Sequence, residues 1–519
     1  MLLPQWILKG SSQTVSHSIT REPIGPSIHE LVSCLAGTSM HPCCCAIRSF
    51  LASRTLRGQG WLGETWHSLA ITHEGFTRRY IFHPIAFFFS NSDSMLREVF
   101  SIFTCVAWVG FAIYLSPWMK DISREVEAYN ATTFQYPVPL STHNEERTRL
   151  MQNLQRSSGK WDSNHPRHRL LTALYGYTSY KDKNLAEVNR WRNLYKNVPK
   201  QQRTLLESTV HYTRKLNTIE HLLDTNNELA KSIVDHGLWF YNISQSELDE
   251  FIKESESQKR SADKTSVSQG MKHFVRDWAD EGHEEREQSF GCILRSLAQT
   301  PRMTDRPLRV LLPGAGLGRL AHEVDNLGGF DVTMNEWSTY MNLAYRYVSS
   351  RSIPNSVPFY PYIDWWSHHA TTEDLQRSIT FPNQVIRPSS VLLIEGDFTT
   401  VFAEHTGQYD ILVTLFFIDT ARNLVTYLET IHRLLRPGGR WVNLGPLLYG
   451  TAPFVQLSLD EIVALSESMG FEFQETDPSV GDITVPGLQV RGLDVAYGRN
   501  ARGLNKNAYQ AQYWEAVKR

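Results

Sequence analysis

Beyond Pro307 the sequence alternates between short apolar runs and amphipathic stretches, and this alternation restricts the possible folds more than any other feature. LRVLLPG is followed by GRLAHEVDNLG, and DVTMNEW is followed by STYMNLAYRYV; SSVLLIEGDF, YDILVTLFFID and GGRWVNLGPL continue the pattern. Near-continuous apolar runs are typical of parallel strands buried on both faces, with helices covering the sheet. We therefore predict an α/β fold with a doubly wound, mostly parallel sheet, whose ligand binds at the carboxyl ends of the strands.

The chain ahead of this region divides into three parts. Residues 1–94 show no sustained period, and we expect an N-terminal extension of low order. Residues 95–120 are a candidate transmembrane anchor, because residues 99–118 are almost wholly apolar and long enough for one membrane crossing; a buried helix or a signal-peptide core is the alternative. Apolar residues at helical spacing then predict a helical domain over residues 121–300, ahead of the sheet domain over residues 301–519.

Charge and cysteine content exclude several classes of function. The 52 Lys and Arg residues nearly balance the 54 Asp and Glu residues, so no overall field would attract nucleic acid. The six cysteines form neither paired CxxC arms nor a secreted disulfide framework. We therefore expect a catalytic domain in the reducing cytosol, with no metal and no nucleic-acid partner.

A glycine turn, PGAGLG, separates the first predicted strand from its helix. Gly314, Gly316 and Gly318 let the backbone turn tightly and approach a ligand at the start of that helix. Glu336 ends the second predicted strand, where a carboxylate can accept both hydroxyl groups of a ribose. This arrangement suits a nicotinamide dinucleotide and S-adenosylmethionine equally, although Arg319 replaces the third glycine of the dinucleotide pattern.

Two further segments favour S-adenosylmethionine over a dinucleotide. In GDF, Asp397 can accept from an adenine amino group while Phe398 packs on the ring; a simple strand-end carboxylate is the alternative for Asp397. LLRPGGRWV combines a helix end, a tight turn and a buried strand. With Glu336 and the glycine turn, these segments resemble the class I methyltransferases, which implies a seven-stranded sheet.

Several longer segments resemble one family in order and spacing. PGAGLGRLAHEV, NEWSTYMNLAYRYV, FFIDTARN, RPGGRWVNLGPLLY and HFVRDWADEGHEER are similar to the carnosine N-methyltransferase family, built around an N2227-like domain. The resemblance begins near Pro166 and reaches the C-terminus. It implies transfer of a methyl group from S-adenosylmethionine to an imidazole ring nitrogen of a histidine-containing dipeptide, converting carnosine to anserine.

The resemblance also implies roles for individual residues on the cofactor side. It makes Gly314, Glu336, Asp397 and Phe398 cofactor contacts, and it places Leu415 beside the cofactor where the family can have Cys. Arg276 is expected over the cofactor, paired with its carboxylate. His273 stands where the family has Gln, and either side chain can donate a hydrogen bond. A surface ion pair is the alternative for Arg276.

The acceptor side is expected to contain three catalytic residues. Asp419 follows the fourth predicted strand, where a carboxylate could orient an imidazole ring and stabilise the methylated cation; a cap on the next helix is the alternative. Tyr497 and Tyr509 match the family's acceptor-pocket tyrosines. Gly450, however, replaces the family's substrate-binding His, so a different small nitrogen acceptor is an alternative substrate.

We therefore predict an S-adenosylmethionine-dependent N-methyltransferase acting on a small-molecule or peptide imidazole. A dehydrogenase on the same sheet and a membrane-anchored, non-catalytic scaffold are the alternative functions. Membrane anchoring through residues 99–118 and a homodimer are both compatible with the sequence.

Overall fold

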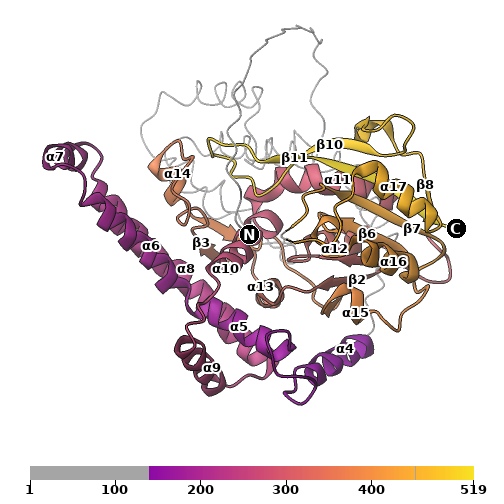
Figure 1. Ribbon diagram of the computed structural model, residues 1–519, viewed down its shortest axis with the longest axis horizontal. Coiled ribbons are helices and arrows are strands. Elements are labelled where there is room, and N and C mark those ends of the chain that lie inside the picture. Colours follow the sequence, from indigo (N-terminus) through magenta and orange to yellow (C-terminus); the bar gives the residue numbers. More distant parts are fainter. Residues whose placement is uncertain (1–139, 451) are drawn as a thin grey trace, which may run out of the picture. The chain divides into compact units, whose positions relative to one another are not determined.

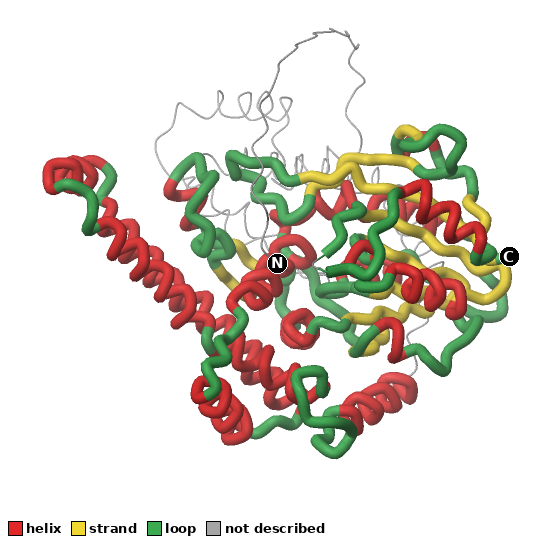
Figure 2. The backbone as a smooth tube through the Cα atoms, in the orientation of Figure 1, coloured by secondary structure: helices red, strands yellow, loops and turns green. Residues whose placement is uncertain are grey.

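A sheet of nine strands carries the C-terminal part of the protein (Figures 1 and 2). In the computed structural model, which describes residues 140–450 and 452–519, the strand order is β5-β2-β1-β6-β7-β11-β10-β9, and β8 pairs with β11. The strands are β1 (Leu308–Pro313), β2 (Phe330–Glu336), β5 (Val391–Glu395), β6 (Tyr409–Leu415), β7 (Leu435–Gly445), β8 (Phe471–Phe473), β9 (Asp482–Ile483), β10 (Arg491–Ala496) and β11 (Ala508–Lys518).

The first five strands in that order run parallel, whereas β11 is antiparallel to β7. The α/β class and the mostly parallel sheet are thus confirmed. The expected count of seven strands is too low. β8 and β10 pair with different ends of β11, at residues 516–518 and 508–513, and the segment between them adds the short β9.

Both faces of the sheet are buried, which explains why its strands are apolar throughout. Along β1, Val310 and Leu312 belong to one hydrophobic core, and Leu311 between them belongs to the other, as the alternation of side chains along a strand requires. The second core lies under α16 (Leu424–Leu434) and α17 (Leu459–Ser468). The first core continues into the helices that precede the sheet.

These preceding helices are α4 (Leu140–Asn153), α5 (Pro166–Thr178), α6 (Tyr180–Tyr195), α7 (Lys200–Thr209), α8 (Tyr212–Tyr241), α9 (Gln245–Ser257), α10 (Lys264–His273) and α11 (His283–Gln299). The long α8 runs beside α6 (Figure 1) and packs on α13 (Thr339–Ser349) of the sheet region. A Cβ on Gly237 of α8 would come within 2.5 Å of the Leu343 side chain in α13, so a larger residue would displace that side chain. The boundary expected near residue 300 stays a prediction.

Two elements that the sequence did not predict position the site. A π-helix, η1 (Phe274–Trp278), and a 3-10 turn, η2 (Asp280–Gly282), join α10 to α11. A small antiparallel pair, β3 (Val357–Phe359) and β4 (Ile379–Phe381), packs on η1, with the rings of Phe274 and Phe381 stacked at 4.2 Å between centroids. A π-helical turn is frequent at functional sites because it displaces side chains from the regular helical positions.

The expected extension over residues 1–94 and the candidate anchor over residues 99–118 lie outside the described residues. Among residues 140–450 and 452–519, none of the helices combines the length and apolar character needed to cross a membrane.

Candidate active site

The glycine turn after β1 faces the carboxylate that ends β2. Gly314, Gly316 and Gly318 have φ values of +66°, +59° and +76°, which favour glycine. The backbone N–H of Gly316 donates to Oε2 of Glu336 at 2.9 Å, and that of Ser338 donates to Oε1 at 2.7 Å. Burial raises the pKa of Glu336, while these N–H groups act in the opposite direction. The turn and Glu336 therefore form one hydrogen-bonded unit.

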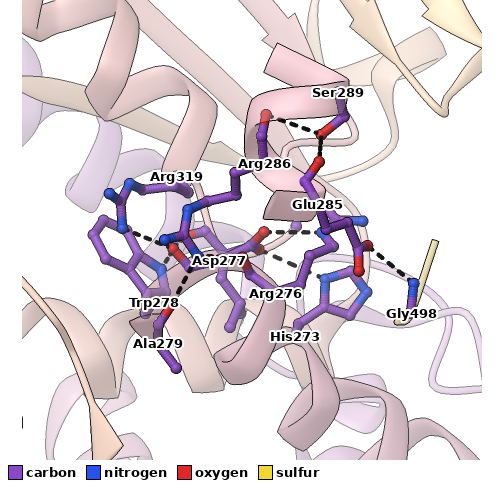
Figure 3. A network of polar contacts seen from close by, with 12 residues as sticks. His273, Arg276, Asp277, Trp278, Ala279, Glu285, Arg286, Ser289, Arg319 and Gly498 are labelled. Atoms are coloured by element: carbon purple, nitrogen blue, oxygen red, sulfur yellow. Dashed lines mark hydrogen bonds and ion pairs between the residues drawn. The ribbon is translucent and has the colours of Figure 1, made fainter. Parts of the chain in front are cut away.

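Residues of η1 contact the same turn, and Figure 3 shows their polar contacts. Asp277, which is only 1% exposed, accepts from Arg276 Nε at 2.9 Å and from the backbone N–H of Leu317 at 3.3 Å. Burial alone would raise the pKa of Asp277, but the Arg276 guanidinium and His273 outweigh it, so the pKa lies below its ordinary value. Arg276 does form an ion pair, as the alternative proposed, but with a side-chain exposure of 18% for Arg276 and 1% for Asp277 the pair lies mostly inside the protein.

His273 lies between η1 and the glycine turn. Its Nδ1 is 3.6 Å from Oδ2 of Asp277, too long for a hydrogen bond, and among the described residues this buried nitrogen has no hydrogen-bond partner. The same ring is the nearest neighbour of the position that a Cβ on Gly316 would occupy. A buried polar atom without a partner at a glycine turn indicates room for a polar ligand group.

Three residues expected on the cofactor side line one small cavity of about 20 Å³, which has room for about one water molecule. Arg276, Gly314 and Leu415 are brought together there from η1, the turn after β1 and the end of β6. Nε of Arg276 is engaged by Asp277, whereas its terminal nitrogens have no hydrogen bond to any described residue. The fork of the guanidinium is therefore free to pair with an anionic ligand group.

The GDF segment joins this arrangement at the end of β5. The N–H of Gly396 donates to the carbonyl oxygen of Glu336 at 3.1 Å, which places Asp397 beside β2. Asp397 caps the short α15 (Phe398–Val401) by accepting from the N–H of Thr399 at 2.8 Å. Phe398 is buried edge-on against Phe417, with centroids 5.4 Å apart. Phe417, which the sequence did not single out, thus stands beside the predicted cofactor residues.

Asp419 follows β6 in a 3-10 turn, η3 (Ile418–Thr420), and is 6% exposed. It accepts from the backbone N–H of Leu448 at 3.0 Å. The next helix, α16, begins after Asn423, so Asp419 is not its cap. Burial raises the pKa of Asp419 to about 6, although its backbone hydrogen bonds lower it in part. In the described part of the chain Asp419 forms no ion pair with Lys or Arg, and such a buried carboxylate is unusual in a purely structural role.

The two tyrosines lie together with Phe416. The rings of Phe416 and Tyr497 stack at 4.9 Å between centroids, and Tyr509 meets Tyr497 edge-on at 5.9 Å. Burial raises the pKa of Tyr509, and its electrostatic interactions with Tyr497 and Asp419 raise it further. The guanidinium carbon of Arg276 lies 5.7 Å from the centre of the Tyr497 ring. Tyr497 therefore contacts both Arg276 and Tyr509.

Sequence reasoning missed Asp277, Phe416 and Phe417. Asp277 is adjacent to the predicted Arg276, and Phe416 and Phe417 are the first two residues after β6. These positions in the sequence are the only signal that could have indicated them. For metal binding, no group of three or more His, Cys, Asp or Glu residues among residues 140–450 and 452–519 could hold an ion.

The strand order, the glycine turn held by Glu336 and the polar residues at the carboxyl ends of the strands define a class I methyltransferase, which uses S-adenosylmethionine. A family model described as carnosine N-methyltransferase matches residues 253–519, slightly more than half of the chain. The chain belongs to the carnosine N-methyltransferase family.

Individual relatives agree with this family. The carnosine N-methyltransferase of Mus musculus is 32% identical over 306 residues, which cover 56% of this chain and 75% of that protein. The carnosine N-methyltransferase of Schizosaccharomyces pombe is 31% identical over 339 residues, covering 60% and 84%. Among solved structures, phosphoethanolamine N-methyltransferase 2 of Haemonchus contortus in complex with S-adenosyl-L-methionine has a TM-score of 0.27 at 12% identity, covering 48% of this chain and 59% of that one. No conclusion follows from a structural likeness of that size.

Proposed function

We propose that this protein transfers the methyl group of S-adenosylmethionine to an imidazole ring nitrogen of a histidine-containing dipeptide, with carnosine as the acceptor and anserine as the product. The observation that carries the proposal is the position of Asp419. It is a buried carboxylate that interacts electrostatically with Tyr509, and Tyr509 packs edge-on against Tyr497, whose ring contacts the Arg276 guanidinium. Membership of the family supports the same substrate.

The residues around Arg276 and the glycine turn would fit the polar groups of the cofactor, and we place the cofactor cleft there. The fork of Arg276, held by Asp277, would pair with the carboxylate of the methionine part. Glu336 would accept from the ribose hydroxyls; each of its oxygens already accepts one backbone N–H and retains a second lone pair. Asp397 and Phe398 would contact the adenine, and Gly314, Gly316, Gly318, Leu415 and His273 would line the rest. The bound cofactor supplies an electrophilic methyl group on a sulfonium.

The acceptor side must present an unprotonated ring nitrogen to that methyl group. Asp419 would accept the N–H of the other ring nitrogen, which fixes the tautomer and directs the lone pair toward the cleft. The same carboxylate would then stabilise the positive charge that forms on the ring. The rings of Tyr497 and Tyr509 would enclose the imidazole and exclude water.

The cofactor assignment can be tested separately from the chemistry. Arg276→Lys keeps the positive charge but removes the fork and the Nε bond to Asp277. We expect S-adenosylhomocysteine to bind about tenfold or more weakly, measured by isothermal titration calorimetry. Arg309→Lys is the matched control, because Arg309 is largely exposed on β1 and makes only a 3.9 Å ion pair with Asp331. If both variants bind S-adenosylhomocysteine equally well, Arg276 is not part of the cofactor site.

The activity is tested with the full chain and methyl-labelled S-adenosylmethionine. Label should enter carnosine and not anserine, whose acceptor nitrogen is already methylated, and Asp419→Ala should abolish the transfer while S-adenosylhomocysteine still binds. Label in another nitrogen nucleophile but not in carnosine would assign a different acceptor to the same site. Cofactor binding without transfer to any nitrogen compound would refute the proposed reaction.

A further inference from the structure

Tyr497 lies in a short segment, residues 496–499, that leaves β10 and is held by side chains of α11. The backbone N–H groups of Gly498 and Arg499 donate to the two carboxylate oxygens of Glu285, each at 2.9 Å. One turn further along α11, Oε1 of Gln288 accepts from the N–H of Ala496 at 3.0 Å. Figure 3 shows the Glu285 carboxylate facing Gly498. The backbone on both sides of Tyr497 is therefore bound to one helix.

Glu285 differs sharply from its neighbour on the same helix. Glu285 is 4% exposed, and in the described part of the chain its hydrogen-bond donors are backbone N–H groups, not Lys or Arg side chains. Glu284 pairs with the Arg499 side chain but is 60% exposed. Burying a carboxylate is costly unless strong hydrogen bonds compensate. The contacts of Glu285 are thus the ones that define the path of this segment.

The next residue along α11 holds the cofactor side of the site. Arg286 donates to the carbonyl oxygens of Arg276 and Ala279 at 2.7 and 2.8 Å. Adjacent residues of one helix therefore hold η1, which carries Arg276, and the segment that carries Tyr497. Because a helix is rigid over two residues, the separation of these two segments is determined at this point. The stack of Tyr497 on Phe416 and its contact with Arg276 both depend on that separation.

We propose that Glu285 is a positioning residue for methyl transfer: it holds residues 496–499 so that Tyr497 stands between the cofactor cleft and the acceptor. This inference rests on the proposed function, because it assigns Tyr497 to the acceptor pocket. Glu285 touches neither reactant, so its effect is expected on acceptor binding rather than on cofactor binding.

The test compares Glu285→Gln with Glu284→Gln in the full chain. Glutamine has the shape of glutamate but only one oxygen, so one of the two N–H groups loses its acceptor. We expect hydrogen exchange at Gly498 and Arg499 to accelerate about tenfold, and KM for carnosine to rise about tenfold, since one hydrogen bond near a charge is worth roughly that factor. The Kd of S-adenosylhomocysteine should change by less than about threefold. Glu284→Gln, which loses an exposed ion pair to the same segment, should match the wild type in all three measurements.

The outcomes separate this proposal from the proposed function. If the wild-type protein methylates no imidazole, the proposed function is refuted without any variant. The role of Tyr497 in an acceptor pocket is then refuted as well. In an active enzyme, unchanged exchange and unchanged KM in Glu285→Gln overturn the positioning role. An equal rise in KM in Glu284→Gln overturns it as well, because the effect would then reflect only the charge near the segment.

Discussion

Phe417 lies so close to Gly314 that a Cβ at Gly314 would meet its ring at 2.4 Å. The same ring contacts Phe398 edge-on and stacks on Tyr427 at 4.7 Å between centroids, so it has little freedom to move. The first glycine of the turn is therefore required for two reasons: its backbone has a φ of +66°, and the aromatic cluster after β6 occupies the space beside it.

Gly314→Ala should impair both the fold and cofactor binding. A left-handed backbone costs an alanine roughly 1–2 kcal/mol, and displacement of Phe417 adds to that cost. We expect the free energy of unfolding to fall by about 2 kcal/mol or more, and S-adenosylhomocysteine to bind at least about tenfold more weakly. Chemical denaturation and calorimetry measure the two effects. Gly291→Ala is the control: it lies within α11 with open space around its Cβ position, and should stabilise the protein by roughly 0.5–1 kcal/mol.

The rate of methyl transfer should fall as the pH drops through about 6. Burial raises the pKa of Asp419 to about 6, and the protonated form cannot accept the ring N–H of the substrate. The imidazole acceptor also ionises, near pH 6.5, and loses its nucleophilic lone pair. The pH profile of kcat/KM should therefore show two ionisations in the wild type. The residual activity of Asp419→Asn should show only that of the acceptor; an identical profile in both would contradict the role of Asp419.

Asp419→Asn should stabilise the folded protein while it reduces turnover. The pKa of Asp419 is about 6 in the folded protein, above its ordinary value of 3.8. Below pH 3.8 the carboxyl group is protonated in both the folded and the unfolded state and costs no stability. As the pH rises through about 6, the folded protein must bury a charged carboxylate, and stability is lost. Two pKa units correspond to roughly 3 kcal/mol, an upper limit for the cost of the buried charge at pH 7.5. Asparagine removes that charge and can still accept from Leu448. Urea unfolding should show the gain at pH 7.5 and a smaller gain at pH 5; destabilisation at both would show that the fold needs the carboxylate.

Gly450→His should restore a polar contact on the acceptor side. Gly450 follows Tyr449, whose hydroxyl group is fixed by a 2.6 Å hydrogen bond to the carbonyl oxygen of Leu457. We expect KM for carnosine to fall by about tenfold, the value of one hydrogen bond to a charged group, with no change in the Kd of S-adenosylhomocysteine. Gly450→Ala should leave KM unchanged; an equal fall there would attribute the effect to backbone stiffening.

The sequence alone determined the order of strands and helices and the residues at the carboxyl ends of the strands. Apolar runs must be buried on both faces, and parallel strands end at one edge, so Gly314, Glu336 and Asp397 had to come close together. The number of strands was not predictable, because β8 and β9 are only three and two residues long and pair with β11 and β10, respectively.

Only the tertiary structure decided how the rest of the site is held. Asp277 and Glu285 look like ordinary helix-surface carboxylates in the sequence, yet both are buried because η1 and α11 bring them against backbone N–H groups of distant turns. Phe416 becomes part of the site because it stacks on Tyr497, which lies in the connection between β10 and β11. Local periodicity indicates which face of an element is apolar, but which distant segment meets a polar side chain depends on how the helices pack on the sheet.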